Sequence, residues 1–392
     1  MPIHRTGFVA VQMRPIASES NEVPHSGVRR FRSFTVAALP NVSLQRAFGY
    51  DVVMRSVSII LYSIVPLVLC TVSAQAAKTL DIYAIDTEGG QSTLIVSPSG
   101  QSLLIDTGFA GNSDRDPNRI LAATKAAGLK KIDFLLITHF HGDHFGGVES
   151  LAKQIPIGTF LDHGPSVQTQ DGKPAYPDVY SAAFAKAEHK VVAPGDKIAV
   201  KGLDITVVEA GGKPIDRKGE PNQYCAGLEP RPENDKGEAG EDPQSVGVEV
   251  QLGKFRFLDL ADLTLNKQLA LFCPDNRIGK VDLYLTSRHG NDSPKAFYGT
   301  TPRVAIMNNG PKKGGNTEGW KSVSASPGIE DVWQVHYAVA NGKEANSDDR
   351  EIANIAEGAD DQGLYIKASA LSNGSFTVTN ARNGFSKTYK AR

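Results

Sequence analysis

Three histidines and one aspartate lie within six consecutive positions, in the segment His139-Phe140-His141-Gly142-Asp143-His144. The whole chain holds only nine histidines. Imidazole nitrogens and carboxylate oxygens are the usual protein ligands of zinc, iron and manganese. The spacing therefore predicts a transition-metal site rather than a chance group of surface histidines.

The cluster must be positioned by the element before it. It follows the apolar run 134–137, which indicates a buried strand that ends where the histidines begin. Three other polar residues, Asp106, Asp262 and His289, also stand at the ends of predicted strands. Because strand ends at one edge of a sheet converge, these residues are expected to share a site with the cluster. Asp106 precedes a glycine and also fits a simple turn-forming aspartate.

Two runs of strand signals predict the fold. The first run begins with three short strands joined by Gly/Pro turns, which is typical of an antiparallel meander. The second contains a hairpin over 245–261, and the chain ends in another over 363–379. Two meander halves closed by helices predict an α/β (α+β) fold with two sheets face to face and helices outside. The predicted helices are 116–127, 145–155, 179–188 and 263–272.

Composition and length bound the domain organisation. The chain has 392 residues, 40% of them hydrophobic, with 38 glycines and 22 prolines, as in globular proteins rich in turns. We expect a core domain over 77–310 that contains a polar insertion at 210–243. Residues 311–392 are expected to form a C-terminal extension packed on this core.

The first 76 residues are expected to lie outside the globule. Residues 54–76 combine a basic start, a short apolar run and an Ala-x-Ala ending, which predicts a secretory signal peptide cleaved after Ala76. The apolar run is too short for a confident membrane span. Residues 1–53 lack any hydrophobic period and are interpreted as an upstream misreading of the gene before a true start at Met54. The alternative is a genuine disordered leader before an anchor helix.

Export changes the cysteine and charge counts. Without Cys70, the mature chain keeps Cys225 and Cys273, an even pair in an oxidising compartment, which predicts one disulfide. Residues 1–76 carry seven Lys/Arg and three Asp/Glu, so 42 basic residues become 35 and 43 acidic residues become 40. The resulting net charge of −5 gives no basic footprint for nucleic acid. A periplasmic or secreted protein with no stable membrane span after cleavage is expected.

The histidine cluster and the segments predicted to meet it resemble those of a known family. The motif His139-x-His141-x-Asp143-His144, after Leu104-Ile-Asp106-Thr-Gly108, is similar to that of the metallo-β-lactamase superfamily. The segments Phe257-Leu-Asp-Leu-Ala-Asp262-Leu263 and Arg288-His289-Gly290 resemble the ComEC-type, phosphorylcholine-esterase-like branch. The resemblance covers about residues 80–310 and implies a four-layer αββα sandwich with a C-terminal β-hairpin extension.

The resemblance also implies a two-metal centre. His139 and His141 would bind the first ion; Asp143, His144 and His289 would bind the second, and Asp262 would bridge them. Two divalent metal ions are expected, zinc first, with manganese and iron as alternatives. A metal-bridging hydroxide would attack the substrate. Asp106, Asp143 and Asp262 are the predicted catalytic carboxylates, with Asp106 holding a ligand in place.

The sequence departs from the superfamily pattern in three places. No His-x-x-Gly-His motif supplies the third histidine of the first metal; His163 is a candidate, or else a hydrogen-bonded structural histidine. The branch's Asn-x-x-Ser pattern appears as Asp242-Pro-Gln-Ser245, so Asp242 or Ser245 is expected to border the site. Arg288 replaces the first histidine of the branch's His-His-Gly. An arginine there would bind an anionic substrate, unless it forms a surface ion pair.

The leading hypothesis is an exported dinuclear metal-dependent hydrolase of phosphodiesters or other anionic esters. Its substrate would be a small molecule or an envelope component, bound with help from Arg288, His163 and Ser245. β-Lactam or lactone hydrolysis is the alternative, weakened by the missing third histidine. A non-catalytic metal-binding protein of the same fold is the alternative of another class, and the full second-metal ligand set argues against it.

Overall fold

The computed structural model describes residues 78–392, except residues 170, 233, 292–293 and 359–360. The expected leader (1–53) and signal peptide (54–76) lie outside the described residues. Across the described part of the chain, no helix combines the length and the apolar character needed to cross a membrane.

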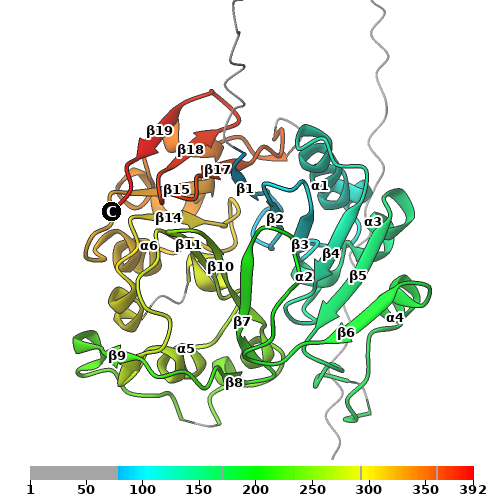
Figure 1. The fold of residues 1–392 in the computed structure, drawn as a ribbon, viewed down its shortest axis with the longest axis horizontal. Helices are drawn as coiled ribbons and strands as arrows, with labels where there is room; N and C mark the ends of the chain where they lie inside the picture. The colour runs from blue at the N-terminus through cyan, green and yellow to red at the C-terminus, as the bar shows by residue number, and fades with distance from the viewer. Residues whose placement is uncertain (1–77, 170, 233, 292–293, 359–360) are drawn as a thin grey trace, which may run out of the picture. The chain divides into compact units, whose positions relative to one another are not determined.

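Two large β-sheets form the centre of the protein (Figure 1). The first contains β1 (Leu80–Ala84), β2 (Thr93–Val96), β3 (Ser102–Ile105), β4 (Ile132–Leu136), β5 (Ile157–Asp162), β6 (Glu188–Val191), β17 (Ile366–Ala370), β18 (Phe376–Asn380) and β19 (Ser386–Tyr389). Its strand order is β19-β18-β17-β1-β2-β3-β4-β5-β6. The second contains β7 (Asp204–Ala210), β8 (Lys213–Pro214), β10 (Gly247–Leu252), β11 (Phe255–Asp259), β13 (Leu283–Leu285), β14 (Val304–Met307), β15 (Asp331–His336) and β16 (Ile352–Asn354). Its order is β16-β15-β14-β13-β11-β10-β7-β8.

The two sheets pack face to face and helices cover their outer faces. The central apolar layer is contributed by both sheets and includes Ile95, Leu136, Phe257 and Trp333, all fully buried. On the outer face of the first sheet lie α1 (Arg115–Ala126), α3 (Val148–Gln154) and α4 (Asp178–Phe184). On that of the second lie α5 (Leu265–Phe272) and α6 (Thr317–Ser324). Figure 1 shows these two helical groups on opposite sides. The predicted αββα fold is confirmed.

The strand pairing corrects one expectation. Strands β1, β2 and β3 form the predicted antiparallel meander, and β10 and β11 form the predicted hairpin. The prediction that both halves are meanders is wrong beyond these strands. Parallel pairing joins β3, β4, β5 and β6 in the first sheet and β11, β13, β14, β15 and β16 in the second. Helices between these strands carry the chain back across the sheet, which makes the next pair parallel.

Residues after 310 add strands to both sheets. β15 continues the second sheet in parallel with β14, and β16 follows it at the edge. The predicted terminal hairpin is present as β17 and β18, and β17 pairs with β1 in an antiparallel register from Leu80–Ala370 to Ala84–Ile366. Figure 1 shows this orange and red hairpin beside the blue first strand.

The polar insertion is tied to the helix that follows it. Its short strand β9 (Glu220–Pro221) pairs with β12 (Asp275–Asn276) just after α5. The sulfur atoms of Cys225 and Cys273 are 2.02 Å apart, so the predicted pair stands at disulfide distance. The insertion is therefore held at two neighbouring points of the second sheet's helical face.

Glu209 on β7 provides a pH-dependent stability prediction. Its carboxyl group is buried and neither oxygen makes a hydrogen bond with the described residues. Burial raises its pKa to about 8, although Lys267 and Arg277 act in the opposite direction. The folded state therefore keeps a proton that the unfolded state loses, so stability falls as pH rises from the ordinary value of 4.5 to about 8.

Replacing Glu209 with Gln removes this proton dependence. We expect the Glu209→Gln chain to gain stability over the wild type by about 1.4 kcal/mol per pH unit within this window, as an upper limit. Urea unfolding at pH 5, 6, 7 and 8 would measure the gap. The exposed Glu229 gives a matched control, and Glu229→Gln should show no such trend. A gap that stays constant with pH would contradict the assignment.

Candidate metal centre

The predicted cluster begins where β4 ends, and neighbouring strand ends meet it there. Asp106 directly follows β3, and the backbone N–H of Thr138 donates to its Oδ1 over 2.8 Å. Asp262 follows β11 and His289 follows β13. Because β3, β4, β11 and β13 are parallel neighbours within their sheets, their carboxyl ends lie at one edge. This is how residues up to 183 positions apart come to share one place.

A first ligand group consists of His139, His141 and Asp242. The Oδ1 atom of Asp242 lies 2.7 Å from Nδ1 of His141 and 3.4 Å from Nε2 of His139. The two ring nitrogens are 3.1 Å apart. His139 is fully buried, whereas His141 is half-buried. These three residues offer two imidazoles and a carboxylate to one ion.

A second ligand group consists of Asp143, His144, Asp262 and His289, all buried. Oδ2 of Asp143 lies 3.3 Å from Nε2 of His144 and 3.2 Å from Nε2 of His289. Oδ2 of Asp262 lies 3.2 Å from Nε2 of His289, and its Oδ1 lies 3.5 Å from Nε2 of His144. Each histidine therefore faces both carboxylates.

The two groups are adjacent, and their atoms suit cations. The rings of His139 and His144, one from each group, have centroids 4.0 Å apart. Nε2 of His144, Nε2 of His289 and Oδ1 of Asp262 are buried and make no hydrogen bond with the described residues. Buried polar atoms nearly always have a partner, and nitrogen and carboxylate oxygen donors of this kind bind transition-metal ions. The residues therefore fit a centre for two divalent cations.

Electrostatics within the centre favour ionised carboxylates. Burial lowers the pKa of His144, but Asp262, Asp106 and Asp143 outweigh burial and raise this pKa well above its usual value. Burial raises the pKa of Asp262, but His289 and His144 outweigh it and hold the pKa well below its usual range. The centre thus keeps its carboxylates ionised, which is the form that binds a metal cation.

Asp106 lies behind His144. Its carboxylate is completely buried and accepts hydrogen bonds from the backbone N–H and Oγ1 of Thr138, over 2.8 and 2.7 Å. Its Oδ2 is 2.7 Å from Nδ1 of His144. This contact fixes the imidazole so that Nε2 points toward Asp143 and Asp262. A ligand held in this way keeps its orientation and basicity.

His163 and Ser245 lie near the first group without belonging to it. Nε2 of His163 is 3.1 Å from Oε2 of Glu241, so this histidine is paired with a buried glutamate. Oγ of Ser245 is 3.4 Å from Nδ1 of His139. The structure places Asp242, rather than His163, beside His139 and His141.

Glu241 connects three loops around the first group. It accepts hydrogen bonds from the backbone N–H of Phe140 and Val167 and from Oγ of Ser166, over 2.9, 2.6 and 2.8 Å. Burial would raise its pKa, but His163 and these donors outweigh burial and lower it to about 2. Glu241 thereby fixes the chain immediately before Asp242. This role was not predicted, because no local sequence pattern marks a buried glutamate inside a polar insertion.

Two basic side chains reach the ligand groups. Arg288 Nη1 is 2.7 Å from Oδ2 of Asp242, so the ion pair considered for this arginine is made with a member of the first group. Lys313 contacts Oδ2 of Asp143 in the second group. Lys313 was not predicted from the sequence. The segment 311–315, which carries two lysines, follows β14, and β14 is parallel to β13 and ends at the same edge.

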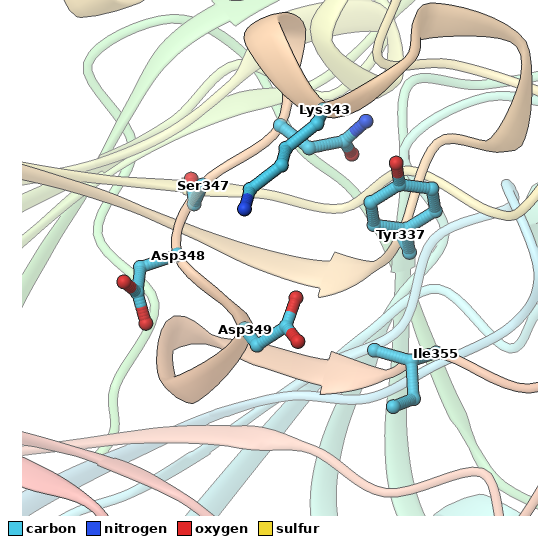
Figure 2. A pocket seen from close by; sticks show the side chains of 7 residues that line it. Tyr337, Lys343, Ser347, Asp348, Asp349 and Ile355 are labelled. Atoms are coloured by element: carbon cyan, nitrogen blue, oxygen red, sulfur yellow. The ribbon is translucent and has the colours of Figure 1, made fainter.

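A pocket of about 750 Å³ lies apart from these groups in the C-terminal region. Figure 2 shows its lining, which includes Tyr337, Lys343, Asp349 and Ile355. None of the residues of either ligand group lines it. We place the chemistry at the ligand groups, because buried ligand atoms converge there and not in this open, mixed-charge pocket.

Comparison with known proteins gives a partial match. Residues 85–216 match the model of the metallo-beta-lactamase superfamily. A UPF0173 metal-dependent hydrolase of Cupriavidus metallidurans is 33% identical over 81 residues, which cover 20% of this chain and 26% of that protein. An atrochrysone carboxyl ACP thioesterase of Cryptosporiopsis sp. is 28% identical over 130 residues, covering 32% of this chain and 33% of the thioesterase. The chain thus spans between a quarter and a third of the length of these curated relatives.

Solved structures are similar at low identity. The metallo-beta-lactamase fold protein YhfI of Bacillus subtilis shares 12% identity over 65% of this chain and 96% of YhfI, with a TM-score of 0.39. Zn²⁺-bound PqqB of Methylobacterium extorquens shares 15% over 53% of this chain and 72% of PqqB, with a TM-score of 0.33. The ComEC-type, phosphorylcholine-esterase-like branch is not confirmed by these comparisons and stays a prediction. The family match is therefore to the metallo-β-lactamase superfamily and covers residues 85–216, about a third of the chain.

Proposed function

We propose that this protein is a metal-dependent hydrolase with a two-cation centre that acts on phosphodiesters or other anionic esters. The observation that carries the proposal is the pair of adjacent ligand groups, which contact each other through the rings of His139 and His144. Between them they offer four imidazoles and three carboxylates, most of them buried. So many ligands close together are typical of a site that binds metal cations rather than of a structural ion pair.

The residues divide between the two cations. His139, His141 and Asp242 would hold one, and Asp143, His144, Asp262 and His289 would hold the other. Mixed nitrogen and oxygen ligands favour zinc, with manganese or iron as alternatives. When bound, two divalent cations supply a water of lowered pKa and polarise an ester oxygen.

The chain's own residues orient the metal ligands and favour one class of substrate. Asp106 holds His144 in place from behind, and Asp262 faces both histidines of the second group. Arg288 and Lys313 bring two positive charges to the ligand groups, and their side chains are 23% and 44% exposed. Basic side chains at a partly open centre favour substrates that carry negative charge.

A metal analysis and a substrate panel test the proposal. We expect the purified chain to hold close to two transition-metal ions and to hydrolyse bis(p-nitrophenyl) phosphate faster than nitrocefin, a lactone or a thioester. His141→Ala removes one of three ligands of the first group, so turnover should fall by at least about a hundredfold. His189 lies outside both groups, and His189→Ala should keep the activity. A wild type without metal, or equal turnover after His141→Ala, would refute catalysis at this centre. Preferred turnover of nitrocefin or the lactone would favour the β-lactamase or lactonase alternative.

Export of the protein is part of the proposal. It is supported by the signal peptide predicted over 54–76 and by Cys225 and Cys273, which stand at disulfide distance. Disulfides persist in oxidising compartments and are rare in the cytosol. A periplasmic or secreted location is therefore proposed, with a phosphate-bearing envelope component as one possible substrate.

A further inference from the structure

The loop 310–315 is packed closely against the second ligand group. The N–H of Gly315 donates to the carbonyl of His289 over 2.7 Å. A Cβ atom at Gly314, where φ is +81°, would lie 2.5 Å from Cβ of His289. A Cβ at Gly89 would lie 2.6 Å from Cβ of Lys313. Only glycine allows both approaches, and together they bring Lys313 to the centre.

The ammonium group of Lys313 lies between a carboxylate and an aromatic ring. Its Nζ contacts Oδ2 of Asp143 and is 5.4 Å from the centroid of the Phe109 ring. That same carboxylate oxygen faces Nε2 of His144 and Nε2 of His289, over 3.3 and 3.2 Å. The ammonium of Lys313 therefore contacts the same oxygen of Asp143 that points into the second ligand group.

The basic residue at the first group is arranged differently. Arg288 pairs with Oδ2 of Asp242, while Oδ1 of that aspartate faces His139 and His141. The arginine thus leaves the ligand oxygen of the first group to a cation. In the second group the ligand oxygen and the oxygen bound by the basic residue are the same atom.

We propose that Lys313 is a built-in competitor for the second cation. A cation at the second group must displace the ammonium of Lys313 from Oδ2 of Asp143, whereas Arg288 pairs with Oδ2 of Asp242 and leaves Oδ1 of that aspartate to the first cation. The two sites are therefore filled in order, His139-His141-Asp242 first, and Lys313 weakens binding at the second. This inference rests on the proposed two-cation centre and adds the order and relative strength of loading.

Zinc titration of the metal-free full chain against a chromophoric chelator tests the inference. Lys313→Met keeps the length of the side chain and removes its charge. We expect the second dissociation constant to fall by about two- to fivefold, the size of a partly exposed ion pair, and the first to stay unchanged. Lys313→Gln should behave in the same way, and Lys313→Arg, which keeps the charge, should stay near the wild type.

Lys312 offers a matched control one position away. Its side chain is 80% exposed and pairs with Glu357 over 3.1 Å, outside both ligand groups. Lys312→Met should leave both constants unchanged, which separates a local contact from a general loss of charge. An unchanged second constant in Lys313→Met and Lys313→Gln, or an equal change in both constants, would overturn the inference. A wild type that binds neither zinc nor manganese nor iron would instead refute the proposed function.

Discussion

Replacement of Asp262 with alanine is expected to remove one of two bound cations and to lower hydrolysis by about 10³-fold, or about 4 kcal/mol of activation free energy. Asp262 is buried and faces both histidines of the second group, over 3.5 and 3.2 Å. Without it, His144 and His289 keep only Asp143 as a neighbouring carboxylate in their group. Metal content by elemental analysis and steady-state turnover would measure the two effects.

Two variants separate charge from shape at this position. Asp262→Asn keeps the shape of the side chain but removes its charge, so it should also lose a cation and most of the activity. Asp216 has an exposed side chain outside both groups, and Asp216→Ala should match the wild type in both measurements. Two retained cations with wild-type turnover in Asp262→Ala would refute a role for this carboxylate.

Replacement of Asp106 with alanine is expected to lower the free energy of unfolding of the metal-free chain by about 3–5 kcal/mol. The substitution leaves the N–H and Oγ1 of Thr138 and Nδ1 of His144 without their buried partner. Asp106 also has a φ of +60°, a conformation that aspartate tolerates better than alanine. Both effects act in the same direction. Urea unfolding would measure the loss.

Asp106→Asn gives the contrast for this prediction. Asparagine tolerates the same backbone conformation and can accept from Thr138 through one oxygen, so its loss should be smaller, about 1–2 kcal/mol. Asp216→Ala, at an exposed position, should change stability by less than about 0.5 kcal/mol. If Asp106→Ala were as stable as the wild type, the buried network behind His144 would not support the fold.

The layers and the ligand cluster could be predicted because their signals are local. The run 134–137 is apolar and ends at the histidines, so both the strand and the position of the cluster follow from neighbouring residues. Asp262 and His289 also follow apolar runs, and each lies in the second ligand group. The direction of strand pairing has no local sequence signal. It depends on which helices return over the sheet, and the expectation of two meanders failed there.

Asp242 and Lys313 show the limit for the site. Asp242 was expected only to border the centre, because an aspartate inside a polar insertion has no period or strand end to position it. Its place beside His141 depends on Glu241, which ties the insertion to Phe140 and Val167 through hydrogen bonds. The position of Lys313 beside the second ligand group depends on close backbone approaches at Gly89 and Gly314. Such contacts join segments that are distant in sequence, and no local pattern records them.

The pairing of β17 with β1 bears on how the chain acquires its fold. The first described strand is an interior strand, flanked by β2 on one side and by β17, almost 300 residues later, on the other. Until residues 366–370 are available, β1 keeps an exposed edge with unpaired backbone groups, which invites association with other chains. The first sheet therefore cannot be completed before residues 366–370 have been synthesised. A partner that shields β1 until these residues are available would protect the chain from aggregation.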